Sequence, residues 1–184
     1  PVTLNQKLPL LSGGKLFTLQ LDFEGADKLS ATASVKAQED ALTGVPMVQA
    51  EDFTGQGGGE VHIRDDKVDA TGKAISHWDN KDHWLSWDIQ VEKDGPYWLL
   101  VRYCTPNRVQ REVQLDDQAP TKQAFDRTGG FGDAAGDWAH AITRDPAGQR
   151  LVLDLKAGAH KVKMTNLDGL GMNLDYIALV PVGG

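Results

Sequence analysis

The amino-acid sequence predicts an all-β fold, an antiparallel β-sandwich, over residues 47–182. Short runs of strand-forming residues follow one another along this stretch, and turns such as Lys93–Pro96 and Asp168-Gly169 separate them. No segment keeps apolar residues at the 3.6-residue period of an amphipathic helix. Many short strands, glycine-rich turns and no helix are typical of two packed antiparallel sheets.

The strands are expected where apolar residues alternate with polar ones, or where β-branched and aromatic residues gather. The predicted strands are Val48–Phe53, Ala74–Ser76, Trp84–Val91, Tyr97–Cys104, Arg111–Leu115, Leu151–Leu155, His160–Met164 and Leu174–Val180. The stretch from Gln118 to Gln149 contains no predicted strand, so we interpret it as an enlarged loop.

Residues 1–46 are predicted to be a separate stretch of strands and linker. Lys15–Phe23 and Leu29–Lys36 each alternate apolar and polar positions, and Ala37–Pro46 is the expected connection. Two strands are rarely stable alone, so this stretch either packs onto the sandwich or is the tail of a neighbouring domain. Because the chain opens at Pro1 without Met or a signal peptide, we expect a processed product or a fragment of a larger protein.

Composition narrows the classes of partner. The formal net charge of −7 argues against nucleic acid, which is held by clustered Lys and Arg. No apolar run approaches the roughly 20 residues that cross a bilayer, so no membrane partner is expected. Cys104 is the only cysteine and lies in an apolar strand pattern, which indicates a buried, unreactive thiol.

Three oxygen-bearing side chains are candidates for a metal site. Gln49 and Glu51 are two residues apart, so on a strand both point to the same face. If the first and last strands of the sandwich pair, Asp175 lies near them. Two carboxylates and an amide oxygen suit calcium. The alternative interpretation is a set of surface polar residues on an edge strand.

Aromatic side chains in the loops are the second feature that indicates a binding site. Trp87 and Trp98 lie inside strand patterns and are expected to pack inward, whereas Trp78 stands in a polar loop. Phe131 and Trp138 lie in a glycine-rich segment that begins at Thr128. Flat aromatic faces in polar loops fit the apolar face of a sugar ring. The alternative is that these rings cover the open end of the sandwich core.

No catalytic residues are expected. The sequence has no G-x-S-x-G element, and its histidines lack the i, i+4 helical spacing of zinc hydrolases. Carboxylates are abundant, but a glycosidase needs two of them facing each other across a cleft.

Residues 47–182 resemble carbohydrate-binding modules of the family 6 and family 35 type. The residues that carry this resemblance occur in the order Gln49–Phe53, Gly72–Ser76, Trp84–Ile89, Gly95–Tyr103, Leu155–His160 and Gly171–Ile177. Each segment on its own matches the family only loosely, but the six segments occur in the family's order across three quarters of the chain.

The resemblance implies a jelly-roll-like sandwich with a structural calcium ion at Gln49, Glu51 and Asp175. It also implies a sugar site in the loops at one end, with the matching residues being Trp78 (or His77), Phe131 and Asn173, and with Trp138 as an addition. The chain departs from the family pattern at Phe131, where the family usually has Trp, and in the enlarged loop from Gln118 to Gln149.

The sequence therefore predicts a non-catalytic carbohydrate-binding module that holds a tethered polysaccharide-active enzyme near its glycan. Asn107 and Arg108 are expected to add hydrogen bonds to the sugar. We expect a monomer that is extracellular, at the cell surface or periplasmic. The sequence leaves uronic-acid and sulfated glycans open as ligands beside neutral ones, because it contains Arg64, Arg108, Arg111 and Arg127. The alternatives are a small polysaccharide-active enzyme and a domain that binds a protein partner.

Overall fold

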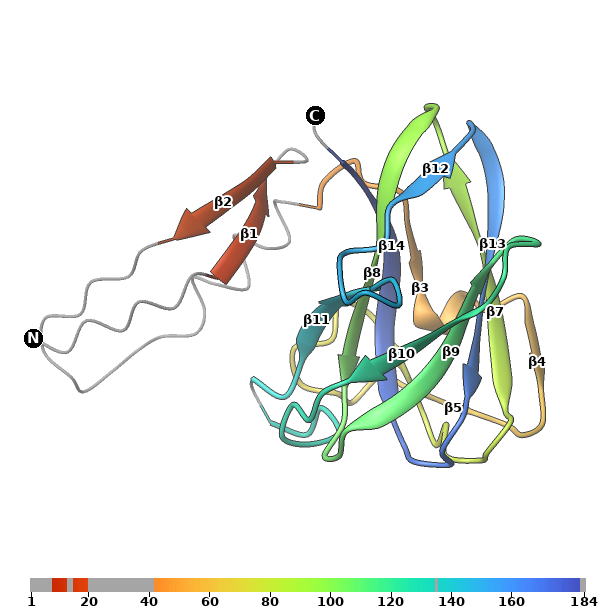
Figure 1. Cartoon of the computed structure of the whole chain (residues 1–184). Coiled ribbons are helices and arrows are strands. Elements are labelled where there is room, and N and C mark those ends of the chain that lie inside the picture. Colours follow the sequence, from red (N-terminus) through yellow and green to blue (C-terminus); the bar gives the residue numbers. More distant parts are fainter. Residues whose placement is uncertain (1–7, 13–14, 20–41, 135, 183–184) are drawn as a thin grey trace, which may run out of the picture. The chain divides into compact units, whose positions relative to one another are not determined.

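The computed structural model of the chain describes residues 8–12, 15–19, 42–134 and 136–182. The chain divides into two compact units, and the larger one spans Pro46–Val180. Strands β1 (Leu8–Ser12) and β2 (Lys15–Leu19) form an antiparallel hairpin in the other unit (Figure 1). Strand β2 coincides with the first part of the predicted strand 15–23, whereas the predicted strand 29–36 lies outside the described residues.

The larger unit is a sandwich of two β-sheets (Figure 1). The five-stranded sheet has, in spatial order, β10 (Thr121–Phe125), β9 (Val109–Leu115), β13 (Gly158–Asn166), β7 (Trp84–Val91) and β4 (Gly55–Gly57). The seven-stranded sheet has β11 (Ala139–Ile142), β8 (Gly95–Cys104), β14 (Asn173–Pro181), β6 (Ala74–Ser76) and β5 (His62–Arg64), with β12 (Leu153–Leu155) on β8 and β3 (Met47–Gln49) on β14.

The predicted all-β sandwich is confirmed, with four strands that the sequence pattern missed: β4, β5, β10 and β11. Strands β10 and β11 lie inside the stretch interpreted as an enlarged loop. The strand predicted over Val48–Phe53 is wrong beyond Gln49, because Ala50–Asp52 forms a 3₁₀ turn. Strand β3 nevertheless pairs antiparallel with β14, as expected for the first and last strands of the sandwich.

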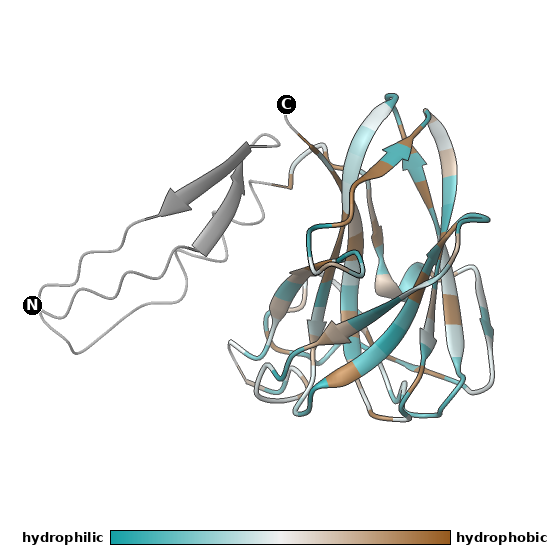
Figure 2. Cartoon of the chain, in the orientation of Figure 1, coloured by the Kyte–Doolittle hydropathy of each residue, from teal (hydrophilic) through white to brown (hydrophobic). Residues whose placement is uncertain are grey.

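Alternation along the strands explains the two layers. In β9 every second residue, Val109, Arg111, Val113 and Leu115, is buried, while those between them are partly or fully exposed. Because successive side chains of a strand point to opposite faces, one face of the sheet is apolar and packs on the other sheet. Figure 2 shows the resulting mixture of hydrophobic and hydrophilic segments along the strands.

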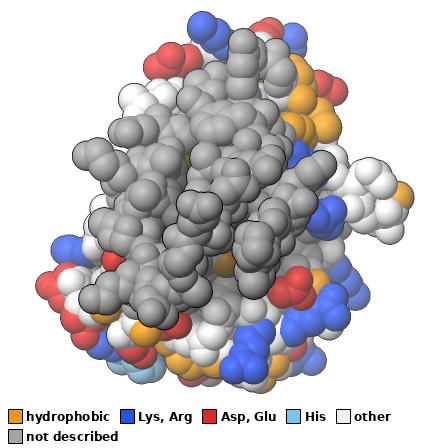
Figure 3. Space-filling view, turned by 90° about the vertical axis from the view of Figure 1, so that its left-hand side faces the viewer, with side chains coloured by type: hydrophobic (Ala, Val, Ile, Leu, Met, Phe, Trp, Pro, Cys, Tyr) orange, Lys and Arg blue, Asp and Glu red, His pale blue; other side chains and the backbone are white. Residues whose placement is uncertain are grey.

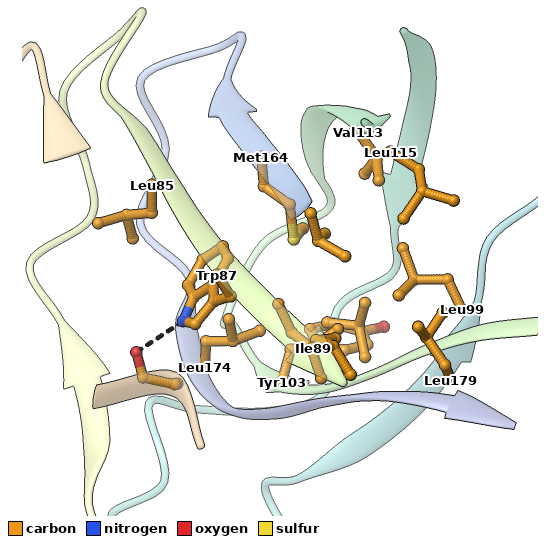
Figure 4. Close-up of a cluster of buried hydrophobic side chains, with 14 of the residues drawn as sticks. Leu85, Trp87, Ile89, Leu99, Tyr103, Val113, Leu115, Met164, Leu174 and Leu179 are labelled. Atoms are coloured by element: carbon orange, nitrogen blue, oxygen red, sulfur yellow. Dashed lines mark hydrogen bonds between the residues drawn. The ribbon is translucent and has the colours of Figure 1, made fainter. Parts of the chain in front are cut away.

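The core lies between the two sheets (Figure 4). Leu85, Trp87 and Met164 are fully buried there, and each such side chain contributes about 1.5–3 kcal/mol by leaving water. The indole Nε1 of Trp87 donates a hydrogen bond of 2.9 Å to the carbonyl oxygen of Ala50, so the 3₁₀ turn is anchored to the core.

Cys104 is fully buried, and burial raises the pKa of its thiol to about 12. The thiolate is therefore not formed at neutral pH, and the expectation of an unreactive cysteine is confirmed. Among the residues that the structure describes, no helix is long and apolar enough to cross a membrane.

One surface histidine gives the fold a pH dependence. Asp116, after β9, pairs with Nδ1 of His160 at 2.7 Å, and Nε2 of His160 lies 2.8 Å from the carbonyl oxygen of Lys156. Partial burial lowers the pKa of His160, but the two hydrogen bonds and the charge of Asp116 outweigh it and raise the pKa above the ordinary value. A raised folded-state pKa means that this stabilisation is complete below about pH 6.5 and is lost as pH rises through the folded-state pKa.

We predict that Asp116→Asn flattens this pH dependence. The amide oxygen can still accept the N–H of Lys161, which Asp116 accepts at 2.8 Å, but it no longer favours the protonated imidazole. Urea unfolding at several pH values from about 6 to about 9 should show wild type losing stability relative to the variant as pH rises. Asp94→Asn is the matched control, because Asp94 also accepts a backbone N–H, from Ala157, but pairs with Lys156 rather than a histidine. Identical pH profiles for wild type and Asp116→Asn would contradict the prediction.

Candidate functional site

A pocket of about 200 Å³ lies in the loops at one end of the sandwich, at the lower end in Figure 1. Its walls come from the ends of β5 and β6, the start of β14, and the loop between β10 and β11. The lining residues are Arg64, Lys67, Ser76, His77, Asp79, Phe131, Asp133, Gly171 and Asn173. Residues far apart in sequence therefore meet here because strand pairing brings the segments that carry them together.

A carboxylate organises the loop that presents Phe131. Oδ2 of Asp137 accepts hydrogen bonds from the backbone N–H groups of Gly132, Asp133 and Ala134, at 3.1, 3.1 and 3.2 Å. Gly132 has φ +78°, and a Cβ there would lie 2.8 Å from the ring of Trp138. This close approach in a left-handed conformation requires glycine, and it gives the loop a defined shape.

The Phe131 ring forms the apolar wall of the pocket. It is 37% exposed and lies against Gly171, where an added Cβ would sit 3.2 Å from the ring. Nδ2 of Asn173, at the start of β14, donates a hydrogen bond of 2.7 Å to the carbonyl oxygen of Phe131. The backbone of Phe131 is thus tied to the sheet.

His77 stands at the pocket edge in an unusual conformation. Its φ is +58°, a region that residues other than glycine seldom adopt, and its side chain is exposed. Its ring stacks on that of His62 with a centroid distance of 4.1 Å, and its Nδ1 lies 2.9 Å from the hydroxyl of Ser76. These contacts hold the imidazole where it lines the pocket.

The charged residues of the pocket are mostly paired. Nζ of Lys67 donates to Asp133 at 2.6 Å, and only 6% of the Lys67 side chain is exposed. Arg64 pairs with Asp66 through two hydrogen bonds, and this pairing lowers the pKa of Asp66. Asp79 adds a further carboxylate to the pocket lining. Figure 3 shows acidic and basic side chains interspersed elsewhere on the surface as well.

This arrangement offers one aromatic face surrounded by hydrogen-bonding groups, some of which carry a positive and some a negative charge. An aromatic ring packs favourably on the C–H face of a cyclic ligand, while carboxylate, amide, hydroxyl and guanidinium groups bind its polar substituents. The pocket is smaller than the roughly 300–1,000 Å³ of typical drug-sized sites, so it suits a ligand of about one ring.

Three of the residues expected to contact sugar line this pocket together: His77, Phe131 and Asn173. Asn107 and Arg108 are exposed but do not line it, and Arg108 forms an ion pair of 3.3 Å with Asp126. Trp138 is half-buried, and its Nε1 donates 2.7 Å to the carbonyl oxygen of Val68. Trp138 therefore supports the loop from behind rather than lining the pocket.

The stacking role expected of Trp78 needs correction. Trp78 is fully buried and belongs to the core cluster, with its ring edge-on to Trp87 at 6.5 Å between centroids. Its Nε1 donates 3.1 Å to the carbonyl oxygen of His83. The alternative interpretation, that loop aromatics cover the open end of the core, holds for Trp78, because closing that end buries more apolar surface than exposing the ring would. The inward packing expected of Trp98 is also wrong: it lies half-buried under Arg150.

Sequence reasoning missed most of the charged pocket residues. Asp79 lies two residues beyond His77, and Asp133 two beyond Phe131, so proximity in the loops offered a signal. Arg64 was considered only as one of four arginines that leave acidic glycans open as ligands, and Lys67 follows a strand of three residues with no clear pattern. Only the pairing of β5 with β6 brings these two cations to the pocket.

Arg111, another arginine considered for acidic glycans, is buried beneath the pocket loops. Its guanidinium donates to the side chains of Asn166 and Asp168, at 3.1 and 3.2 Å, and to the carbonyl oxygens of Trp78 and Leu170. Burial lowers the pKa of Arg111 to about 10, against the opposing charge of Asp168, so it stays protonated at neutral pH. Arg111 fixes loops and is not available to a ligand.

The three candidate metal ligands surround residues 71–73. A Cβ on Gly72 would lie 3.6 Å from Oε1 of Glu51 and 3.8 Å from Oε1 of Gln49. The N–H of Lys73 donates to Oε1 of Glu51 at 3.2 Å. The remaining oxygens, Oε2 of Glu51 and Oε1 of Gln49, are buried and have no hydrogen-bond partner within the part of the chain that the structure describes. Buried oxygens without a donor are costly, so these two suit a cation.

Asp175 is nearby but already engaged. Its carboxylate accepts the N–H of Thr71 at 3.0 Å and the hydroxyl of Thr71 at 2.9 Å, and it forms a buried ion pair with Arg102. Burial raises the pKa of Asp175, while Arg102 and Thr71 act in the opposite direction. The described residues contain no group of three His, Cys, Asp or Glu side chains arranged for a metal, so any cation here also depends on the amide of Gln49.

Comparison with known proteins identifies the fold. No protein-family model matches the sequence, and no curated protein matches it. A family 35 carbohydrate-binding module from Clostridium thermocellum is similar in structure, with a TM-score of 0.58, 18% identity, and coverage of 74% of this chain and 97% of that one.

Two further solved structures are similar. The module CBM6cm-2 of Cellvibrio mixtus lichenase 5A, in complex with cellotriose, has a TM-score of 0.52 at 20% identity over 76% of this chain and 98% of its own. The GH26-CBM35 β-(1,4)-mannanase of Podospora anserina has a TM-score of 0.56 at 20% identity, and the match covers 76% of this chain and 28% of the mannanase.

The architecture thus defines a β-sandwich with the class of fold that carbohydrate-binding modules have. Within that class, the chain has the fold of the family 6 and family 35 modules, and the resemblance seen in the sequence is confirmed for the fold.

We predict that Trp78→Ala destabilises the protein by about 3–5 kcal/mol, because it leaves a large cavity in the core. Guanidinium chloride unfolding followed by fluorescence measures this loss. Phe131→Ala is the matched control, since its ring is partly exposed and its removal should cost much less. If Trp78→Ala kept wild-type stability, the core position of Trp78 would be contradicted; Trp78→Phe gives a milder test if the alanine variant does not fold.

Proposed function

We propose that this protein is a non-catalytic module that binds a glycan through the loop-end pocket. The observation that carries the proposal is the fixed, partly exposed Phe131 ring among polar side chains, on a fold shared with carbohydrate-binding modules. A sugar ring stacks its C–H face on Phe131, and its hydroxyls bond to Asp79, His77 and Arg64. The CBM6cm-2 structure holds cellotriose, which supports a glycan ligand.

The charges of the pocket favour a neutral sugar. Arg64 and Lys67 are already paired with Asp66 and Asp133, and Asp79 adds a negative charge. A uronic acid or sulfate group must compete with those carboxylates and meet repulsion from Asp79. A neutral sugar meets neither cost. The ligand class proposed is therefore a neutral poly- or oligosaccharide, of which one residue enters the pocket.

The module is proposed to act beside a tethered enzyme. Its counterpart in Podospora anserina is one part of a mannanase chain, which supports a catalytic domain on the same polypeptide. Binding at one sugar residue is modest in affinity, because each new hydrogen bond replaces one to water, but tethering raises the local concentration of the enzyme at its substrate. We therefore propose that the protein acts outside the cell or at its surface.

We predict that Phe131→Ala weakens glycan binding at least tenfold while leaving the fold intact. A glycan array that includes neutral and acidic polysaccharides, followed by affinity electrophoresis, should show wild type binding a neutral glycan and the variant losing at least tenfold in affinity. Val152→Ala is the matched control, since Val152 is also an exposed hydrophobic side chain but lies outside the pocket. No release of reducing sugar is expected from the bound glycan.

Three outcomes would contradict the proposal. Wild type that binds no glycan, neutral or acidic, would favour the alternative of a protein-binding domain. Binding that survives Phe131→Ala would place the glycan site elsewhere. Turnover that disappears in Asp79→Asn or Asp133→Asn would favour a small polysaccharide-active enzyme.

We also propose that a structural calcium ion is held by Gln49 and Glu51, beside Asp175. The two buried oxygens without hydrogen-bond donors support this, and oxygen ligands are those that calcium prefers. Because Asp175 shares its charge with Arg102, its part in binding is to make the surroundings more negative. A calcium ion there would join the 3₁₀ turn to residues 71–73 and so stabilise the fold.

We predict that calcium raises the melting temperature of wild type and not that of Glu51→Gln. At a calcium concentration of about 100 times Kd the stabilisation is about 2.7 kcal/mol. In chelator Glu51→Gln should be at least as stable as wild type. The substitution removes the negative charge of a carboxylate whose oxygen Oε2 is buried without a hydrogen-bond partner among the described residues. Calorimetry with calcium, with magnesium and with chelator measures this, and Glu92→Gln, an exposed site, is the control. Equal melting temperatures of wild type in calcium and in chelator would contradict the proposal.

A further inference from the structure

His83 is a fully buried histidine that does not line the loop-end pocket. It lies directly before β7, and neither Nδ1 nor Nε2 of its ring has a hydrogen-bond partner among the residues that the structure describes. A neutral imidazole carries one N–H donor and one acceptor nitrogen, so two polar groups are buried unpaired here. Buried polar groups without partners lower stability and are rare in folded proteins, which makes His83 a candidate for a role beyond packing.

Two glycines cover the ring of His83. A Cβ on Gly59 would lie 2.5 Å from Nδ1 of His83 and 2.8 Å from Nδ2 of Asn80, and a Cβ on Gly58 would lie 3.0 Å from Cα of His83. Gly58 also has φ +85°, a conformation that residues with a side chain seldom adopt. We call Gly58 and Gly59 the glycine lid. The lid has no side chains to pack against its neighbours, and glycine gains more backbone freedom than any other residue when it is released.

The surroundings of His83 favour the neutral imidazole. Burial lowers the pKa of His83, the negative charge of Asp79 opposes this shift, and the positive charge of Arg111 adds to it. Asp79 belongs to the same loop, whereas Arg111 comes from β9 and is itself paired with Asp168. The glycine lid and Asn166, which also contact this residue, carry no charge. A protonated ring would leave both N–H groups buried, so protonation favours a conformation in which the ring reaches water.

The backbone of His83 anchors the loop between β6 and β7, which forms part of the loop-end pocket. The carbonyl oxygen of His83 accepts hydrogen bonds from Nε1 of Trp78 at 3.1 Å and from the N–H of Asn166 at 2.9 Å. His77 and Asp79, on either side of Trp78, line the pocket. His77 has φ +58°, and a residue is held in that strained region only while its surroundings fix it. Movement of His83 therefore loosens the two pocket residues of this loop.

We propose that His83 and the glycine lid form an acid-sensitive latch on the loop-end pocket. At neutral pH the ring is uncharged, the lid is closed, and the loop between β6 and β7 holds His77 and Asp79 in place. When His83 takes up a proton, the lid opens, the loop loses its anchor, and the pocket loses its shape and its glycan. The effect on the ligand rests on the glycan binding proposed above, whereas the opening of the latch does not.

The direction of the pKa shift defines the pH range in which the latch opens. In the open form the imidazole has its ordinary pKa of about 6.5, and in the closed form its pKa is lower. The closed form is therefore fully favoured above about pH 6.5. Its advantage is lost as pH falls from there through the closed-form pKa, by up to about tenfold per pH unit for one proton. By reciprocity, a glycan that binds only the closed form lowers the pH at which the latch opens.

Hydrogen exchange of backbone amides between about pH 7 and about pH 5 tests the latch without any ligand. The amides of Asp82, His83 and Asn166 all donate hydrogen bonds in or to this loop. After correction for intrinsic exchange rates, their protection should fall by up to about tenfold per pH unit. The amide of Thr143, which is bonded to the carbonyl oxygen of Leu99 between the sheet strands, is the internal control and should keep its protection.

His83→Leu removes the titrating group and keeps a buried side chain of similar size. Its loop amides should show no loss of protection at acidic pH. For the neutral glycan that wild type binds on the array, the affinity of wild type should fall about tenfold from pH 7 to pH 5, and that of His83→Leu should fall much less. His160→Gln is the matched control and should respond to acid as wild type does, because His160 also titrates but contacts Asp116 and Lys156 instead of this loop. An NMR titration of the His83 ring in wild type needs no variant, and its midpoint should lie below about 6.5.

The proposal is overturned if the loop amides of wild type keep the same protection from pH 7 to pH 5. It is equally overturned if glycan affinity falls as steeply in His83→Leu as in wild type, because His77, which lines the pocket itself, is then the titrating group. Wild type that binds no glycan would contradict the proposed function, while the exchange measurement would still decide whether the latch exists. The two proposals therefore fail separately.

Discussion

The buried guanidinium of Arg111 is the interaction on which the loop-end pocket depends. A charged group inside a protein is tolerated when hydrogen bonds and an opposite charge offset most of its loss of hydration. Arg111 lies under the ring of Trp78, at 4.7 Å from its centroid, and draws Asn166, Asp168 and the carbonyl oxygen of Leu170 around it. Because the cost of breaking one of these contacts is high, both loops that border the pocket have one defined conformation.

The consequence is a preformed site. The loop through Trp78 carries His77 and Asp79, and the loop after Asn166 leads to Gly171 and Asn173. The third wall, with Phe131, is fixed separately by Asp137 and by the hydrogen bond from Asn173. A site whose side chains are already in place loses little conformational entropy on binding, which matters for a pocket that contacts about one sugar ring. Function on this scaffold thus resides in the loops, while the sheets supply rigidity.

Periodicity made most of the strands predictable. Ala74–Ser76 and Trp84–Val91 were located to the residue, because alternation or apolar character marks them and turn residues bound them. The 3₁₀ turn at Ala50–Asp52 was not visible, since its formation depends on the hydrogen bond from Trp87 to Ala50. Strands of three residues, such as β4 and β5, are too short to show a period.

In the candidate site, the residues found from sequence were those beside a recognisable feature. Phe131 follows a pair of glycines, and Asn173 precedes a clear strand. Trp78 and Arg111 were misjudged for one reason: a polar sequence neighbourhood indicates exposure, but burial is decided by contacts with residues remote in the chain. Trp78 is covered in part by Arg111, 33 positions away, whose guanidinium lies 4.7 Å from the centre of its ring.

By itself the sequence determined the class of fold, the positions of the long strands and the buried thiol, because each follows from local periodicity and composition. Only the tertiary structure decided which aromatic ring faces solvent, which arginine is internal, and which charges line the pocket. The physical reason is that these properties arise from strand pairing and packing between distant segments, as when β5 pairs with β6 and Arg64 and His77 come to line one pocket.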